Sequence, residues 1–142
     1  MTIDLQTARS IIAAARSSGR DKGFKPLTIV VLDAGGHVVA AEREDGSSFG
    51  RFDVAFGKAH GALALGAGSR SLMARAEQQP YFVAAVTAAI GGSLVPVPGG
   101  VLVQDAAGTL LGAVGVSGDS SDNDEAAAVA GIGAAGLVAQ VN

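Results

Sequence analysis

Hydrophobic residues change their spacing along the first third of the chain. Between residues 4 and 20 they recur every three or four positions, which predicts an amphipathic helix with Thr2 as its N-cap. A β-branched run at 27–32 is followed by a Gly-rich turn at 33–36, which predicts a hairpin with a return strand at 38–44. The first elements are therefore a helix and two antiparallel strands.

The rest of the chain repeats this order of helices and hairpin. The patterning predicts helices at 52–66, 69–76 (capped by Ser69) and 80–90, strands at 101–104 and 110–116, and a last helix from 121 to about 141. Hairpins separated by helices favour an antiparallel sheet with helices packed on it rather than alternating β-α-β units. We therefore expect one α+β domain over residues 1–142, in the order helix-strand-strand-helices-strand-strand-helix.

The last predicted helix carries a signal for assembly. No charged side chain follows Glu125, and hydrophobic residues lie on every side of a helix drawn through 126–141. A helix that is apolar all round must be covered on more than one side. Because a domain of this size offers one sheet, another subunit is the natural cover, and we expect a homo-oligomer, dimer or larger. The alternative is a monomer with a poorly covered tail.

Composition narrows the classes of protein and partner. The 142 residues include 21 Gly and no Cys, which excludes a disulfide framework and a thiolate metal site. A net charge of −3 with ten scattered Lys and Arg offers no basic stripe, so we expect no nucleic-acid partner. No apolar run of about 20 residues is free of Pro and Gly, and the N-terminal segment lacks the apolar core of a signal peptide. We expect no membrane partner and a cytoplasmic location.

The helix predicted at 52–66 holds two candidate functional residues on different flanks. Lys58 and His60 lie about 160° apart around a helix, so one pocket cannot easily receive both. Gly57 and Gly61 form a bare stripe, although Gly costs about 0.8–1 kcal/mol relative to Ala inside a helix. The stripe indicates close approach by a ligand or, alternatively, a simple crossing against a neighbouring helix.

His60 is the first candidate for a metal or haem ligand, because neutral imidazole binds metals readily. We prefer it to His37, which lies beside the predicted hairpin turn, since small neighbours leave room for a flat ligand at His60. Two His without Cys cannot form a structural zinc site unaided. Tyr81 is a second candidate for haem iron. The alternative is a histidine that is simply satisfied within the fold or exposed to water.

Two glycine segments and an acidic helix start are further candidates. Gly99 and Gly100 let backbone N–H groups approach a ligand closely, or they make a sharp bend into the strand. Ser117 and Gly118 lead from a strand to an acidic helix start, where negative charge makes a phosphate site unlikely. Helix capping explains most of the acidic residues at this helix start. At most one of them, such as Asp124, remains for acid–base catalysis.

Several motifs follow one another in a specific order. They are LDAGGHVV at 32–39, Arg43 with Asp45-Gly46, Ala55 with Lys58-Ala59, PGGV at 98–101, and LGAVGVSG at 111–118 followed by Asp124. Together they resemble the GlcG/HbpS-type haem-binding family, which includes the carboxy-terminal domain of PduO-type proteins. The resemblance runs from about residue 4 to residue 139, essentially the whole chain.

This resemblance implies a three-layer α/β fold with an antiparallel sheet, assembled as dimers or larger oligomers. Some members bind haem or related tetrapyrroles, and some relatives are cofactor-free enzymes of aromatic catabolism, such as a hydroxylaminobenzoate lyase. The residues that match the family motifs are Arg43, Lys58, Gly99, Gly100, Ser117, Gly118 and Asp124. The family commonly has Thr where this chain has His60, which marks His60 as a place where this member is specialised.

Two functions are consistent with these residues. In the first, the chain is an oligomeric small-molecule-binding protein, with haem as the ligand and His60 as its axial residue. In the second, it is a cofactor-free lyase or isomerase acting on a small, aromatic acid: Arg51 or Arg43 holds the carboxylate, His60 moves the proton, and Lys58 and Asp124 assist. A third interpretation, a purely structural assembly protein, leaves the glycine motifs unexplained.

Overall fold

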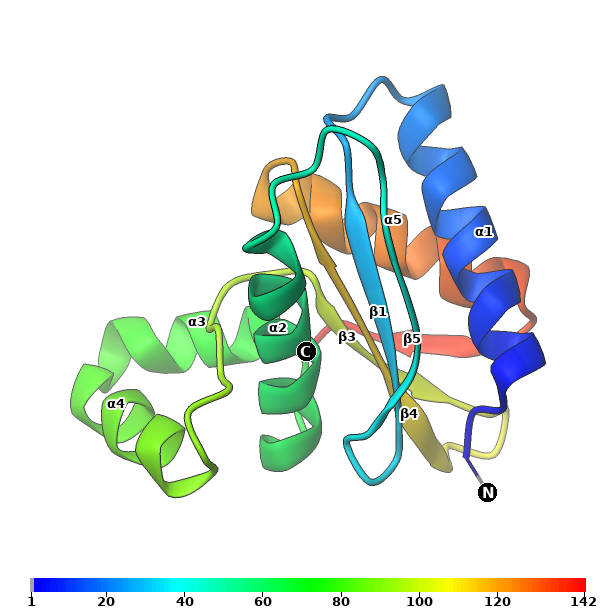
Figure 1. Cartoon of the computed structure of the whole chain (residues 1–142). Coiled ribbons are helices and arrows are strands. Elements are labelled where there is room, and N and C mark those ends of the chain that lie inside the picture. The colour runs from blue at the N-terminus through cyan, green and yellow to red at the C-terminus, as the bar shows by residue number, and fades with distance from the viewer. Residues whose placement is uncertain (1) are drawn as a thin grey trace.

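A five-stranded antiparallel sheet runs through the middle of the computed structural model, which describes residues 2–142 (Figure 1). The elements in chain order are α1 (Leu5–Asp21), β1 (Thr28–Asp33), β2 (Val38–Arg43), α2 (Arg51–Leu65), α3 (Ser69–Gln78), α4 (Pro80–Ala89), β3 (Gly100–Gln104), β4 (Leu110–Ser117), α5 (Ser121–Ala134) and β5 (Val138–Gln140). The strands lie in the order β2-β1-β4-β3-β5. The predicted α+β class is confirmed, and so is the order of elements as far as α5.

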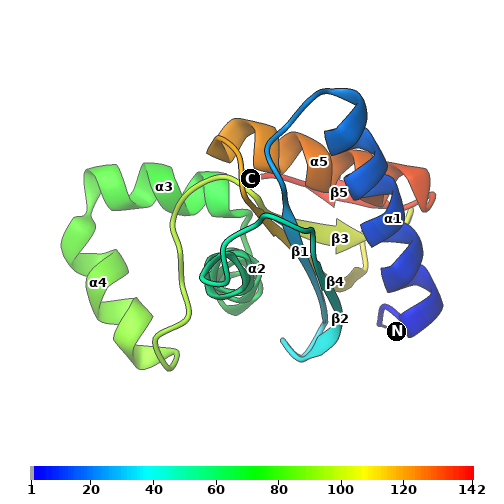
Figure 2. The same ribbon diagram turned by 45° about the horizontal axis from the view of Figure 1, so that its top comes forward.

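The two faces of the sheet have separate hydrophobic cores. Along β1, Ile29 and Val31 pack with α1 and α5, whereas Val30 and Leu32 pack against α2. This division follows from the alternation of side chains along a strand. Because all four side chains are fully buried, β1 reads as an unbroken apolar run in the sequence. Figure 2 shows the resulting layers, with α2 on one side of the sheet and α1 and α5 on the other.

Helix α2 lies very close to the sheet because glycines face it. A Cβ atom at Gly115 of β4 would lie 1.9 Å from the Ala55 carbonyl oxygen, and one at Gly100 of β3 would lie 2.2 Å from the Lys58 carbonyl oxygen. Neither distance is compatible with a side chain, so these two glycines set the spacing between helix and sheet. The close approach brings Lys58 to the ends of β3 and β4.

The bare stripe on α2 contacts an extended segment of the same chain. A Cβ at Gly57 would lie 2.7 Å from Val95 Cγ2, and one at Gly61 would lie 2.8 Å from Leu94 Cγ. The Val95 N–H also donates to the Gly57 carbonyl at 3.1 Å. The stripe is therefore occupied by the strand-like return from α4, so the expectations of a ligand or a second helix there are wrong.

Helices α3 and α4 form an arm on the far side of α2 from the sheet (Figures 1 and 2). Leu72 of α3, Val83 of α4 and Leu94 of the return segment form its small core. Tyr81 of α4 is 70% exposed, so its phenol lies in solvent rather than beside a cavity. The arm and its return segment together place Ile90 and Ser93 beside α2.

Two predicted helix caps are corrected. Asp4, not Thr2, caps α1 by accepting from the Thr7 N–H at 2.8 Å. Gly68 rather than Ser69 is the N-cap of α3, and the hydroxyl of Ser69 instead bonds to the backbone of Gly100. Helix α5 begins at Ser121, as the sequence predicts, and Ser120 is its N-cap. The hydroxyls of Thr2 and Ser69 bond elsewhere, to the carbonyls of Leu111 and Gly100.

The predicted last helix is wrong beyond Ala134. Gly136 has a φ of 75°, which ends the helix, and residues 138–140 form β5 on the edge of the sheet beside β3. Helix α5 also packs against α1 of the same chain, and its residues Ala127, Ala128 and Ile132 are fully buried. The apolar residues of this helix therefore do not require a second subunit to cover them. Within residues 2–142, no helix is long and apolar enough to cross a membrane.

Candidate functional site

Lys58 and Asp124 form a buried ion pair between α2 and α5. The Lys58 side chain is 2% exposed, and its Nζ donates to Asp124 Oδ2 at 3.0 Å and to the Val116 carbonyl at 2.9 Å. Asp124 Oδ1 accepts from the Asp119 N–H at 2.9 Å. Gly99 makes room for the ammonium group, because a Cβ there would lie 2.8 Å from Nζ. The pair thus joins two helices that lie on opposite faces of the sheet.

Burial and charge act in opposite directions on both members of this pair. Burial lowers the pKa of Lys58, the charge of Asp124 raises it, and the charge of Arg51 lowers it further. Burial likewise raises the pKa of Asp124, while Lys58 and the backbone N–H groups lower it. Neither side chain lines the two cavities described next. The pair is therefore enclosed within one subunit, away from both cavities.

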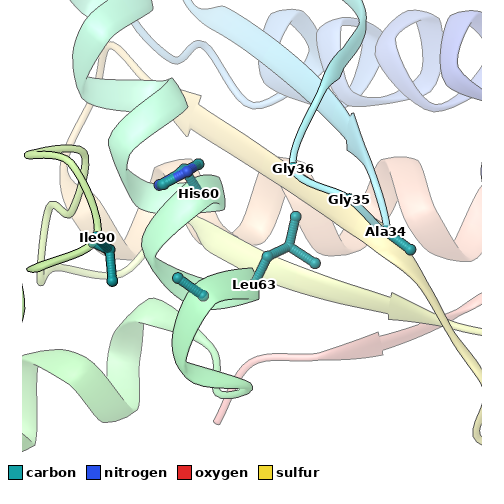
Figure 3. A pocket seen from close by; sticks show the side chains of 7 residues that line it. Ala34, Gly35, Gly36, His60, Leu63 and Ile90 are labelled. Carbon is teal, nitrogen blue, oxygen red and sulfur yellow. The ribbon is translucent and has the colours of Figure 1, made fainter.

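His60 lies in the wall of a cavity of about 260 Å³ between α2, the β1–β2 turn and the end of α4 (Figure 3). The lining residues are Ala34, Gly35, Gly36, His60, Leu63, Ala64 and Ile90. The ring of His60 stacks on Phe56, one helical turn earlier, with centroids 5.3 Å apart and planes at 19°. Phe52 extends this row, with its ring 6.2 Å from that of Phe56.

One hydrogen bond determines which nitrogen of His60 is available. Nδ1 lies 2.8 Å from the carbonyl oxygen of Ser93. Because a carbonyl can only accept, Nδ1 carries the proton and Nε2 of the neutral ring keeps its lone pair. A Cβ built at Gly36 would lie 3.6 Å from Cδ2 and 4.0 Å from Nε2, so the β1–β2 turn passes close to this edge of the ring. His60 is therefore a fixed imidazole with an unused acceptor nitrogen.

A second cavity, of about 150 Å³, lies at the N-terminal end of α2. Its lining residues are Lys25, Pro26, Gly46, Ser47, Ser48, Arg51 and Gly118. Arg51 Nη1 donates to Ser117 Oγ at 3.1 Å. Arg51 and His60 lie nine residues apart on α2, which places them about 180° apart around the helix. The two cavities are therefore separate.

The remaining predicted residues make contacts within the chain. Arg43 Nη1 donates to the Ser47 carbonyl at 2.8 Å and closes the loop after β2. The Gly99 carbonyl accepts from the Val116 N–H at 2.9 Å, and Gly100 lies in β3 under α2. The side chain of His37 is 82% exposed beside Asp33. Across residues 2–142, no cluster of three His, Cys, Asp or Glu side chains could hold a metal ion.

The structure divides the predicted site residues into three places. His60 lies alone in its cavity, Lys58 pairs with Asp124 in the interior, and Arg51 meets Ser117 and Gly118. Phe56 was not predicted as a partner of His60, although the i,i+4 interval between them in a helix predicts contact. The bond to the Ser93 carbonyl was not predicted either, because a backbone oxygen in a loop leaves no signal in the sequence.

The chain resembles known proteins in sequence and in fold. A family model described as "haem degrading protein HbpS-like" matches residues 3–133. A PduOC:heme complex shares 22% identity over 97% of this chain and 98% of its own, with a TM-score of 0.85. A double mutant of Streptomyces reticuli HbpS shares 26% identity over 94% and 86%, with a TM-score of 0.80. Klebsiella pneumoniae protein ORFY shares 23% identity over 96% and 92%, with a TM-score of 0.85. No curated protein sequence matches the chain.

Proposed function

This chain belongs to the HbpS-like family, and from that membership we propose that it binds haem, with Nε2 of His60 as the axial ligand of the iron. The observation that carries the proposal is the bond from His60 Nδ1–H to the Ser93 carbonyl. Metal-binding histidines typically donate their second N–H to such an acceptor, which orients the ring and makes the other nitrogen more basic.

Apolar side chains lie beside His60. Phe56 stacks on one face of the imidazole, and Gly36, which has no side chain, lies beside the ring edge that carries Nε2. Leu63 and Ile90 add apolar walls. Bound haem would supply an iron centre, and the chain itself would supply the nitrogen ligand and the apolar surface. His37 and Tyr81 lack such surroundings, because both side chains are largely exposed.

The cavity encloses only part of a ligand of this size. Its 260 Å³ lies below the range of about 300–1,000 Å³ that is typical of enclosing small-molecule sites. Phe49, 87% exposed, and Phe52, 37% exposed, lie at the N-terminal end of α2, away from the His60 cavity, and leave aromatic surface in water. We therefore propose that a second copy of the chain covers the ligand or this aromatic surface, in a homo-oligomer.

The lyase or isomerase interpretation needs a different arrangement of residues. It requires Arg51 or Arg43 to hold the carboxylate of a substrate whose proton His60 moves. Within one subunit, Arg51 and His60 line different cavities, and Arg43 is bonded to its own loop. A small acid cannot contact Arg51 and His60 of one subunit together, so haem binding is the function that the geometry supports better.

Haem titration of the purified protein tests the proposal. We expect a Soret band that saturates at one haem per chain, disappears in His60→Gly, and returns when free imidazole is added to that variant. His37→Ala is the matched control and keeps the band, because that histidine is exposed. The absence of a band at micromolar protein, or an unchanged band in His60→Gly, would exclude His60 as the ligand.

A further inference from the structure

We propose that the cavity at the N-terminal end of α2 binds the carboxylate group of a small organic acid through the guanidinium of Arg51. This cavity lies on the other side of α2 from His60 and is lined by Lys25, Ser47 and Ser48 in addition to Arg51. The proposed carboxylate site is independent of haem binding, because the two cavities are separated by about 13 Å along the helix axis as well as by half a turn.

Arg51 is a partly buried cation without an acidic partner. Its guanidinium makes one side-chain hydrogen bond, to Ser117 Oγ, and within residues 2–142 no carboxylate lies within 4.0 Å of it. Arg16 and Arg70 also extend from helices, and each is paired with two acids. An arginine has five N–H donors in a planar fork that matches the two oxygens of a carboxylate. Most of these donors remain for a ligand.

The charges around the cavity are mostly positive. Lys25 lies beside Asp119, whose carboxylate accepts from the Lys25 backbone N–H at 2.7 Å. Backbone N–H bonds from Lys25 and Ser120 lower the pKa of Asp119 to about 2, so this acid is ionised at neutral pH. Beneath the cavity, Lys58 is paired with Asp124. In the described part of the chain, Arg51 and Arg43, whose Nη1 donates to the carbonyl of the lining residue Ser47, both lack an acidic partner within 4.0 Å, so the cavity has an excess of positive charge that a carboxylate compensates.

The other walls of the cavity suit a carboxylate attached to a short carbon skeleton. Ser48 is exposed and its hydroxyl makes no side-chain hydrogen bond within residues 2–142, so it is a free donor, whereas Ser47 is buried and bonded to Thr28 at 2.9 Å. Pro26 and Gly46 provide apolar contact. A volume of about 150 Å³ equals roughly five waters at about 30 Å³ each, which fits a small acid and excludes a macrocycle.

Benzoate is the probe for this site, with benzamide as its uncharged counterpart. In ¹⁵N–¹H NMR titrations, we expect benzoate to cause saturable shifts at the Arg51 Nε–H and the Gly118 amide, and benzamide to cause none. Arg51→Gln should weaken benzoate binding at least tenfold, and Arg51→Lys should weaken it less, because it keeps the charge and loses the fork. Arg9→Gln, an exposed arginine on α1, should bind as the wild type does.

Further variants separate loss of the site from loss of the fold. Ser48→Ala, at an exposed position, should weaken benzoate binding without changing the thermal unfolding midpoint. Arg51→Gln should retain the Soret band on haem titration, so a failure of haem binding and a failure of this site are distinguishable. The proposal is overturned if benzamide binds as well as benzoate, if Arg51→Gln binds benzoate normally, or if inorganic phosphate displaces benzoate at equal concentration.

Discussion

Lys58 is a charged residue in a position where a hydrophobic one would ordinarily lie. Its ammonium group is fully enclosed, and Asp124 provides the compensating charge. We expect Lys58→Met to destabilise the protein by about 3–5 kcal/mol, because it leaves the Asp124 carboxylate buried and unpaired. The double variant Lys58→Met, Asp124→Asn should regain much of this loss, since the carboxylate is gone while an oxygen remains for the Asp119 N–H.

Urea unfolding of the single and double variants at neutral pH measures this coupling. A loss below about 1 kcal/mol in Lys58→Met would show that Asp124 is solvated or protonated without its partner. Equal stability of the single and double variants would contradict the pairing itself.

Asp119 gives the fold a dependence on acid. Its pKa in the folded chain is lowered to about 2 from an ordinary value of 3.8, so its bonds stabilise the fold above about pH 4 and are lost as the pH falls toward 2. We expect Asp119→Asn to be less stable than the wild type by about 1–2 kcal/mol at pH 7, with allowance for partial solvation. The two stability curves should converge near pH 2. Parallel curves between pH 5 and 2 in urea unfolding would argue against this assignment.

Helix α5 contains two glycines in contrasting surroundings, which allows a matched test at the scale of the element. A Cβ at Gly131 would lie 2.5 Å from the Ile11 carbonyl oxygen of α1. A Cβ at Gly133 would have no neighbouring atom within 4 Å. Gly133→Ala should stabilise the protein by up to about 1 kcal/mol through helix propensity. Gly131→Ala should lose this gain and cost about 1–3 kcal/mol, because α1 must move away.

Thermal unfolding of these two alanine variants is the measurement. Opposite signs are expected. Stabilisation by both substitutions would show that α1 and α5 pack less closely than their backbones indicate.

The same helix shows why its end was predicted wrongly. The uncharged sequence after Glu125 has apolar residues at helical spacing, and this pattern continues through 138–141. Gly136 interrupts it with a left-handed turn, and the free edge of β3 then pairs with Val138–Gln140. An edge strand of three residues carries no period of its own, so only the presence of β3 beside it makes it a strand.

Assembly belongs to the scale of the whole molecule. Phe49 and Phe52 present aromatic surface to water at the N-terminal end of α2, and burying such surface is a common source of binding energy between subunits. We expect light scattering to give a mass of two or more chains, and Phe49→Ser to shift the distribution toward the monomer. Val129→Ser, on the exposed side of α5, is the matched control and should leave the mass unchanged. A monomer at all concentrations would refute the proposed homo-oligomer.

The pattern of the sequence was sufficient for most of the fold, because its signals are local. Apolar residues at intervals of three and four mark α1 and α2, and the Gly-rich turn at 33–36 marks the first hairpin. The position of Lys58 and His60 on opposite flanks of α2 also follows from helical geometry alone. These features depend on neighbours within a few positions, so they can be read before the chain is folded.

Tertiary structure alone decided what each candidate residue contacts. Lys58 bonds to Asp124, which is 66 positions away in the sequence, and Arg51 bonds to Ser117, also 66 positions away. His60 bonds to the carbonyl of Ser93, 33 positions away. The glycines Gly100 of β3 and Gly115 of β4 contact the backbone of α2, and Gly57 and Gly61 of α2 contact the side chains of Val95 and Leu94. Composition and periodicity determine which elements form and which faces are apolar. Which charges remain unpaired and which nitrogen stays free depend on contacts between distant segments, and such contacts exist only in the folded chain.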